Sequence, residues 1–286
     1  MLKLRIFLSV VCLFLIGFSS QAQEYGEFAN DGYNSNSVRP VHESDLMFKK
    51  TLWLRMSLKE KMNQPFFAKD LEITKLLIDA AKVGIIRPFM NDSMTTRMPQ
   101  EDFLTLLKIP SEGEEMTPDQ FAIFGEIEDD PWDTVEEWEG NDPVEFASDE
   151  YFANQLYILE FKEDLIFDKK RSRMLHDIQS VTIKIPAELN PAGIEKTLAT
   201  FSYKELVNIL FKDNPNAVWY NAKNERSHLN LEDAFDLRLF DAHIIKYDNP
   251  NDEYIVDIYG EGKASVLNSM NYQYNLVEYE SNLWEN

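Results

Sequence analysis

The sequence predicts an α+β fold, with a helical N-terminal lobe, an acidic connector, and a mixed C-terminal lobe of antiparallel strands and a C-terminal helix. Three observations lead to this prediction. Apolar residues recur at helical spacing over residues 70–83, whereas two later runs alternate apolar and polar side chains as strands do. Between them, residues 109–161 carry 17 acidic residues and no Lys or Arg. We therefore expect a mainly helical lobe at 44–108, a connector at 109–150 and the mixed lobe at 151–286.

Residues 1–22 show the order of features found in a secretion signal peptide. Lys3 and Arg5 supply positive charge, residues 6–18 form an apolar core, and Ala22 ends a small-residue cleavage motif. The apolar core is about 13 residues long, which is too short to cross about 30 Å of hydrocarbon as a helix. We expect export and cleavage after Ala22.

The single cysteine, Cys12, lies inside the signal core and not at the cleavage point, so a lipoprotein anchor is not expected. The mature chain then has no thiol, no disulfide and no cysteine-ligated metal. The formal net charge of −22 becomes −24 when Lys3 and Arg5 are removed. Such a charge repels nucleic acid and anionic lipid. It favours a basic partner surface or divalent cations, or it serves solubility alone.

The first elements follow from polarity and spacing. Residues 23–43 are polar and lack apolar periodicity, so they predict an extended arm. A helix is expected over residues 45–56, where the apolar residues form a broad stripe. That stripe comprises Leu46, Phe48, Leu52, Trp53 and Met56. Residues 70–83 give the clearest helix, because Gly84 stands where a C-terminal cap belongs.

Two short elements and the connector come next. Residues 85–98 predict a hairpin, and Pro88 confines its first strand to a sheet edge. A short helix is expected after Pro99. In the connector, Trp132 and Trp138 lie among acidic residues. Large aromatic side chains need burial or a partner surface, so we expect these two tryptophans to bind a partner.

The mixed lobe opens with two alternating runs, residues 157–161 and 181–185, which predict an antiparallel pair of strands. The later elements expected are helices at 203–211 and 231–239, strands at 244–247 and 254–259, and a C-terminal amphipathic helix. The apolar positions of that last helix are Leu267, Met270, Tyr274, Val277 and Trp284.

Catalytic signals are weak. The four histidines are too far apart in the sequence for a helical metal pair, and no phosphate-binding loop or nucleophile elbow is present. The abundance of 50 acidic residues keeps two alternatives open: a hydrolase that uses paired carboxylates, and a soluble module that binds carbohydrate or calcium. No catalytic residue, metal ligand or cofactor is expected.

Four cations occupy five consecutive positions between the two predicted strands: Lys169, Lys170, Arg171 and Arg173. This basic turn contrasts with the acidic chain around it. It predicts a contact with an acidic surface, either of a partner or of another copy, in which Arg171 holds a carboxylate through its planar fork. The alternative is that the turn neutralises acidic groups of its own chain.

The basic turn belongs to a longer motif, residues 162–172, with the sequence Lys-Glu-Asp-Leu-Ile-Phe-Asp-Lys-Lys-Arg-Ser. This motif resembles a signature of the gliding-motility family GldN, called PorN in non-gliding relatives. Leu165 stands where the family has an aromatic residue. The other segments that resemble the family are Trp53 with 59–66, 231–240, and 283–285.

The resemblance implies a non-enzymatic periplasmic subunit of the type IX secretion system of Bacteroidetes. It implies self-association in a ring with an outer-membrane lipoprotein of the GldK or PorK type. It also implies contact with a periplasmic shaft protein of the GldM or PorM type. The expected location is the inner face of the outer membrane, held there through the lipoprotein.

Overall fold

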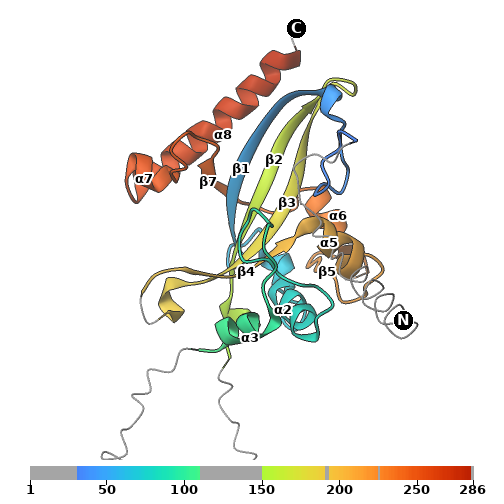
Figure 1. Ribbon diagram of the computed structural model, residues 1–286, viewed down its shortest axis with the longest axis vertical. Coiled ribbons are helices and arrows are strands. Elements are labelled where there is room, and N and C mark those ends of the chain that lie inside the picture. Colours follow the sequence, from blue (N-terminus) through green and yellow to red (C-terminus); the bar gives the residue numbers. More distant parts are fainter. Residues whose placement is uncertain (1–30, 110–149, 191–192, 225, 285–286) are drawn as a thin grey trace, which may run out of the picture.

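A computed structural model describes residues 31–109, 150–190, 193–224 and 226–284. Its centre is a five-stranded antiparallel sheet with the strand order β4-β3-β2-β1-β7 (Figure 1). The strands are β1 (Leu46–Ser57), β2 (Ile158–Asp168), β3 (Arg173–Ile185), β4 (Lys196–Ser202) and β7 (His243–Tyr247). A two-stranded ribbon pairs β5 (Val218–Trp219) with β6 (Leu229–Asn230). Both helices and an antiparallel sheet are present, which confirms the α+β class.

The helices lie around this sheet. They are α2 (Ile73–Val83), α3 (Gln100–Leu107), α5 (Tyr203–Glu205), the π-helical turn η5 (Leu206–Phe211), α6 (Leu231–Asp236), α7 (Ile255–Tyr259) and α8 (Lys263–Trp284). As expected, α2 ends at Gly84, which has a φ of 79° and donates its N–H to the last turn. Within the described residues, no helix has the length and apolar character needed to cross a membrane.

The expected helix at residues 45–56 is wrong, because this segment is strand β1. Its alternate residues Leu52, Leu54 and Met56 are buried on one face, while Trp53 and Arg55 lie on the other. Since β1 pairs with both β2 and β7, the region 44–108 contributes a strand to the sheet of the C-terminal region. The two regions thus share one sheet.

Two smaller expectations also change. Residues 254–259 were expected to form a strand, but they contain the short helix α7. The hairpin expected at 85–98 reduces to one antiparallel bridge between Phe89 and Arg97, and Phe89 also bridges Thr200 of β4. Strand β7, the helices α2, α3, α6 and α8, and the helical segment from Tyr203 to Phe211 lie where the sequence predicts them. The strands predicted at 157–161 and 181–185 are present as an antiparallel pair, but β2 and β3 extend beyond them to Asp168 and Arg173.

The core lies between one face of the sheet and α2, α3, η5 and α6. Phe235 of α6 is at its centre, with its ring 5.1 Å from that of Phe66, 5.7 Å from that of Phe161 and 5.8 Å from that of Tyr203, measured between centroids. At the far end of the sheet, α8 runs beside β1 (Figure 1). There Tyr272 stacks on Tyr247 of β7, with centroids 4.4 Å apart.

Strand β3 contains a bulge at Gln179. Lys162 of β2 faces Ser180, but the next residue, Glu163, faces Ile178. The extra residue reverses the alternation of β3 from that point to the hairpin tip. As a result His176 and Ile178, which lie between the tip and the bulge, share the core face with Val181, Ile183 and Ile185, which follow the bulge in the chain.

Candidate functional site

The basic turn is the tip of the β2–β3 hairpin, and all four of its cations are exposed. The carboxylate of Asp168, only 1% exposed, organises the turn. Its Oδ1 accepts the backbone N–H groups of Lys170 at 2.8 Å and Arg171 at 3.1 Å, and its Oδ2 pairs with Nη1 of Arg171 at 3.0 Å. Burial alone would raise the pKa of Asp168, but these contacts outweigh burial and lower it.

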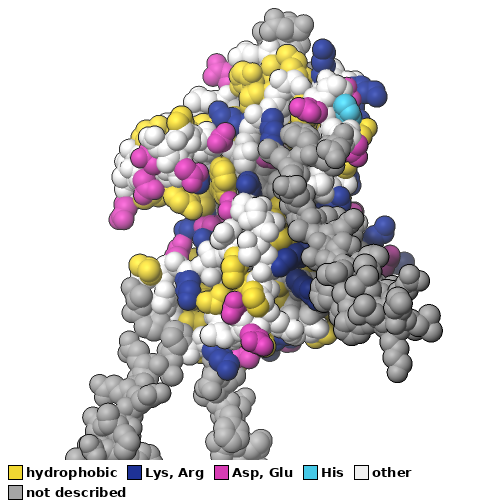
Figure 2. Space-filling model, in the orientation of Figure 1, with side chains coloured by type: hydrophobic (Ala, Val, Ile, Leu, Met, Phe, Trp, Pro, Cys, Tyr) yellow, Lys and Arg dark blue, Asp and Glu magenta, His cyan; other side chains and the backbone are white. Residues whose placement is uncertain are grey.

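Arg171 therefore takes part in an ion pair within its own chain, while 58% of its side chain stays exposed. Among the described residues, no ion pair is found for Lys169, Lys170 or Arg173. These three cations remain open to a partner. Figure 2 shows dark-blue side chains near this end of the sheet, at the upper right. The other predicted partner residues, Trp132 and Trp138, lie outside the described residues, as does the signal peptide.

Below the tip, the hairpin buries Glu163 on the core face at 1% exposure. Its two carboxylate oxygens each meet a cation-forming group: Nδ1 of His176 at 2.5 Å and Nη1 of Arg238 at 2.7 Å. Burial would raise the pKa of Glu163, but His176 and Arg238 together lower it. The same hairpin face lines a cavity of about 230 Å³ with Tyr203 and Phe235.

On the opposite face of the hairpin, Asp164 and Asp177 stand directly across from each other. Asp164 accepts a hydrogen bond from Oγ1 of Thr51 at 2.8 Å and lies 3.4 Å from Nζ of Lys49. Burial raises the pKa of Asp177 to about 7, and the charge of Asp164 adds to the increase. Asp177 also accepts Nε2 of Gln179 at 2.7 Å. The expected arm packs here, since Nδ2 of Asn34 donates to Gln179.

Further along the same face, a groove of about 270 Å³ crosses the sheet. The cross-strand row through it runs from Lys246 on β7 through Trp53 on β1 and Lys162 on β2 to Ser180 on β3. The loop that contains Asp92 closes one side, where the indole N–H of Trp53 donates to Asp92 at 2.7 Å. We call this site the sheet groove.

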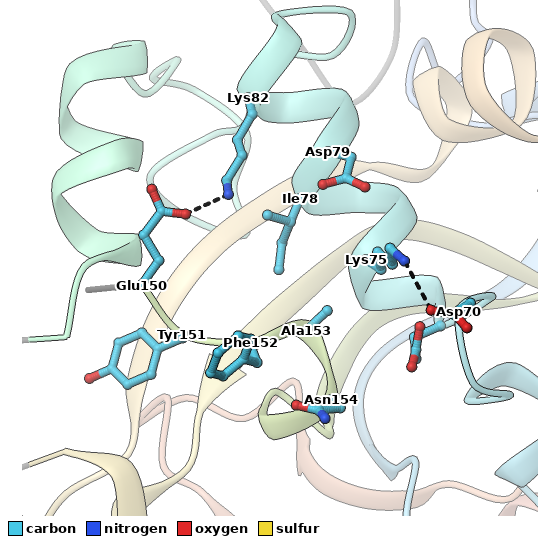
Figure 3. Close-up of a pocket in the computed structure, with 11 residues that line it drawn as sticks. Asp70, Lys75, Ile78, Asp79, Lys82, Glu150, Tyr151, Phe152, Ala153 and Asn154 are labelled. Atoms are coloured by element: carbon cyan, nitrogen blue, oxygen red, sulfur yellow. Dashed lines mark hydrogen bonds and ion pairs between the residues drawn. The ribbon is translucent and has the colours of Figure 1, made fainter. Parts of the chain in front are cut away.

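A larger pocket, of about 420 Å³, lies between α2 and residues 150–154 (Figure 3). Its lysines are already paired with carboxylates of the same pocket. Lys82 meets Glu150 at 2.5 Å and Lys75 meets Asp70 at 3.5 Å. Both lysines are thus neutralised, whereas no ion pair is found for Glu72 or Asp79 among the described residues, so the pocket carries an excess of negative charge.

Helix α8 carries an apolar surface that faces solvent. Of the five apolar positions by which the sequence predicts this helix, four are exposed: Leu267 by 48%, Met270 by 47%, Tyr274 by 67% and Val277 by 60%. The side chain of the fifth, Trp284, lies outside the described residues. A different face, with Ser269, Tyr272 and Leu276, packs on the protein. Figure 2 shows hydrophobic side chains along α7 and α8, at the upper left. We call these four exposed residues the α8 stripe.

Sequence reasoning missed the pairing partners of the hairpin. His176 and Arg238 carry no local motif, and only the fold brings them to Glu163. It also missed the sheet groove, because Lys162 and Ser180 are separated in sequence and meet through strand register. The available signal was the run of polar residues at alternate positions of β2 and β3. In the part of the chain that the structure describes, no cluster of His, Cys, Asp and Glu could hold a metal ion.

Comparison with known proteins places this architecture in a family. A search of curated proteins finds no match. The family model described as gliding motility associated protein GldN matches residues 41–285, which include the whole sheet, the basic turn and the α8 stripe. Because this match covers nearly the full length, the chain belongs to the GldN family of gliding motility associated proteins.

Proposed function

We propose that this protein is a non-enzymatic structural subunit of a periplasmic ring complex that serves protein secretion and gliding motility. Membership of the GldN family supports the link to motility. The observation that supports a structural, protein-binding role is the α8 stripe. Its four apolar side chains lie at steps of three, four and three residues, so they form one continuous surface along the helix.

Single exposed apolar residues are common on soluble proteins, but contiguous apolar surfaces mark sites of protein or membrane interaction. The inward face of α8 already holds the helix in place: Oγ of Ser269 donates to the carbonyl of Ile244 at 2.7 Å, and Tyr279 packs against Phe48 with ring centroids 4.8 Å apart. The stripe is therefore not needed to attach α8, and burial against another protein would stabilise the complex.

The partner we assign to the stripe is the outer-membrane lipoprotein of the GldK or PorK type, with further copies of the chain completing the ring. The shaft protein of the GldM or PorM type is the second proposed partner. The basic turn, through Lys169, Lys170 and Arg173, is proposed to contact an acidic surface in the same assembly. This arrangement holds the subunit in the periplasm, at the inner face of the outer membrane.

The test is co-purification from envelope extracts with the lipoprotein co-expressed. The variant Leu267→Glu with Val277→Glu puts two charges on the stripe. We expect it to weaken lipoprotein binding by roughly 30-fold or more, the loss typical of central interface positions. The control, Asn271→Glu with Asn275→Glu, adds the same charge to exposed polar positions of α8 and should bind normally.

Both double variants should keep the melting temperature of the wild type, since all four positions are exposed. Normal lipoprotein binding by the stripe variant would exclude the stripe as this interface. If the variant lost only the shaft protein or only self-association, the assignment would pass to that partner. A stable monomer that ignores the lipoprotein and hydrolyses a glycan would instead support the paired-carboxylate hydrolase.

A further inference from the structure

The sheet groove contains a buried hydroxyl that has no partner among the described residues. Ser180 is 1% exposed, it lines the groove, and its Oγ makes no hydrogen bond there. The neighbouring hydroxyls of the same face are satisfied: Oγ1 of Thr182 and Oγ1 of Thr200 lie 2.9 Å apart. Buried polar groups are almost always paired in folded proteins, so the hydroxyl of Ser180 is free to bind a ligand atom that enters the groove.

A cation without a carboxylate stands directly across from this hydroxyl. Lys162 is the cross-strand partner of Ser180, and no ion pair is found for it in the described residues. The other lysines of the groove have partners. Nζ of Lys246 meets Asp252 at 2.5 Å, and Nζ of Lys184 meets Glu160 at 3.1 Å.

Trp53 holds the Lys162 ammonium within the groove. Nζ of Lys162 lies 5.4 Å from the centre of the Trp53 ring, and Nζ of Lys246 lies 4.5 Å from it. The indole is fixed in turn by its hydrogen bond to Asp92. Because Asp252 neutralises Lys246, the Lys162 ammonium is the groove charge beside this ring for which no carboxylate partner is found among the described residues.

We propose that the sheet groove binds a carboxylate group, with Nζ of Lys162 and Oγ of Ser180 as its two donors. The two donors can bind the same carboxylate, because Lys162 and Ser180 are cross-strand partners whose side chains lie on one face of the sheet. Asp92 and Glu160 line the same groove and disfavour the second negative charge of a phosphate. The volume of about 270 Å³ suits one acidic residue or a small organic acid.

The indole N–H signal of Trp53 in an NMR spectrum of the full-length mature chain reports on the groove, and Trp53→Phe identifies that signal. The probe is N-acetyl-glutamate α-amide, which carries one carboxylate. We expect it to shift the Trp53 signal saturably, whereas N-acetyl-glutamine α-amide and inorganic phosphate should not. Stronger binding of phosphate, or equal binding of the glutamine probe, would overturn the carboxylate assignment.

Two variants test the donors. Lys162→Met should lower the affinity for the probe at least about tenfold. Its matched control is Lys59→Met, because Nζ of Lys59 also lies over an aromatic ring, 3.5 Å from the centre of Tyr157, but outside the groove. Ser180→Ala should weaken binding several-fold without lowering the melting temperature, since the unliganded hydroxyl has no partner to lose. Unchanged affinity in both groove variants would refute the proposal.

A second probe, an acetylated Ala-Glu-Ala peptide amide, distinguishes two sources of the carboxylate: an acidic side chain of a polypeptide and a free organic acid. Tighter binding of the peptide than of the single residue assigns the groove to an acidic side chain of a polypeptide. Equal or weaker binding assigns it to a free organic acid. In both cases the Lys162→Met variant should lose binding of the probe. If this variant still bound the probe as the wild type does, the proposal would be refuted.

Discussion

The β2–β3 hairpin and helix α8 depart in opposite ways from the usual distribution of side chains. The hairpin buries charged groups, with Glu163, Asp164 and Asp168 each at most 3% exposed. Helix α8 instead exposes apolar groups along a full face. The buried charges meet cations or N–H donors of their own chain, whereas the apolar groups of the α8 stripe are between 47% and 67% exposed. The buried charges of the hairpin therefore fix internal geometry, whereas the α8 stripe offers apolar surface to a partner.

The largest effect expected in the hairpin is that of Glu163→Gln. The variant keeps the volume but loses the charge that Arg238 and His176 face. We expect the free energy of unfolding at pH 7 to fall by about 2–3 kcal/mol, less than for a fully enclosed pair because the side chains of Arg238 and His176 both reach water. Denaturant unfolding measures it, with Glu101→Gln, an exposed carboxylate of α3, as the control.

The pH dependence of that loss sharpens the prediction. Because the pKa of Glu163 is lowered in the folded state, its stabilisation is present above the pKa of the unfolded chain. It should disappear as the pH falls through the folded-state pKa. A difference between wild type and Glu163→Gln that did not shrink in acid would show that the carboxylate charge is not what stabilises the hairpin.

Asp177 is the exception among the buried carboxylates of the hairpin. Its charge lowers stability, so removing it should raise the free energy of unfolding. Its pKa rises from 3.8 to about 7 on folding, so the folded state holds a proton that the unfolded state releases. This lowers stability progressively from about pH 4 to pH 7 and fully above it. Asp177→Asn should therefore stabilise the protein by about 1–2 kcal/mol at pH 8, because a neutral amide removes the buried charge.

Thermal unfolding at a series of pH values measures this gain. It should be largest at pH 8 and decrease as the pH falls from 7 towards 4. A gain that is independent of pH would mean that Asp177 does not titrate in this range. Destabilisation at every pH would mean that the hydrogen bond from Gln179 matters more than the charge.

The smallest effect on stability is expected at the hairpin tip. Arg171→Glu should lower the free energy of unfolding by less than about 1 kcal/mol, because an ion pair with a half-exposed partner contributes little. The backbone N–H groups of residues 170 and 171 still donate to Asp168 in this variant. Lys170→Glu, which breaks no ion pair found here, should cost nothing measurable. If the basic turn contacts a partner, both variants should weaken ring assembly beyond their effect on melting temperature.

Assembly that falls only with Arg171→Glu, and only in proportion to the melting temperature, would make Arg171 an internal brace. The contrast between the hairpin and α8 would then hold without exception. Assembly lost in both variants at normal melting temperature would show that the turn serves both roles.

Much of the fold could be predicted because spacing in the sequence reflects local geometry. The apolar spacing of α2 and the alternation around Val181 are signals of this kind. Strand β1 was predicted as a helix because Leu52, Trp53 and Met56 also satisfy helical spacing. The segment forms a strand because Leu52, Leu54 and Met56 are buried when β1 pairs with β2. This pairing joins segments more than 100 residues apart in the sequence.

The sites were less predictable than the fold for a related reason. The cations of the basic turn are close together in the sequence and easily found, but the pairing of Arg171 with Asp168 depends on the turn conformation, in which Ser172 has a φ of 48°. The α8 stripe was found as a pattern, yet an apolar pattern does not state which way it faces. Only the position of Tyr272 against Tyr247 shows that the stripe points outward.

The bulge at Gln179 has a consequence for how this chain can change in length. One extra residue sets which side of the hairpin each side chain of β3 occupies between the tip and Gln179. Deleting a single residue there would exchange the two faces up to the tip, which would place Ile178 on the face of the buried Asp164 and Asp177 against Phe235 and the core. Between Gln179 and the tip, the hairpin therefore tolerates insertions and deletions only of two residues at a time, or within the turn itself. Gln179 thereby separates two regions of the hairpin. The tip side can change length by an even number of residues, whereas the register of the strands that line the sheet groove is fixed.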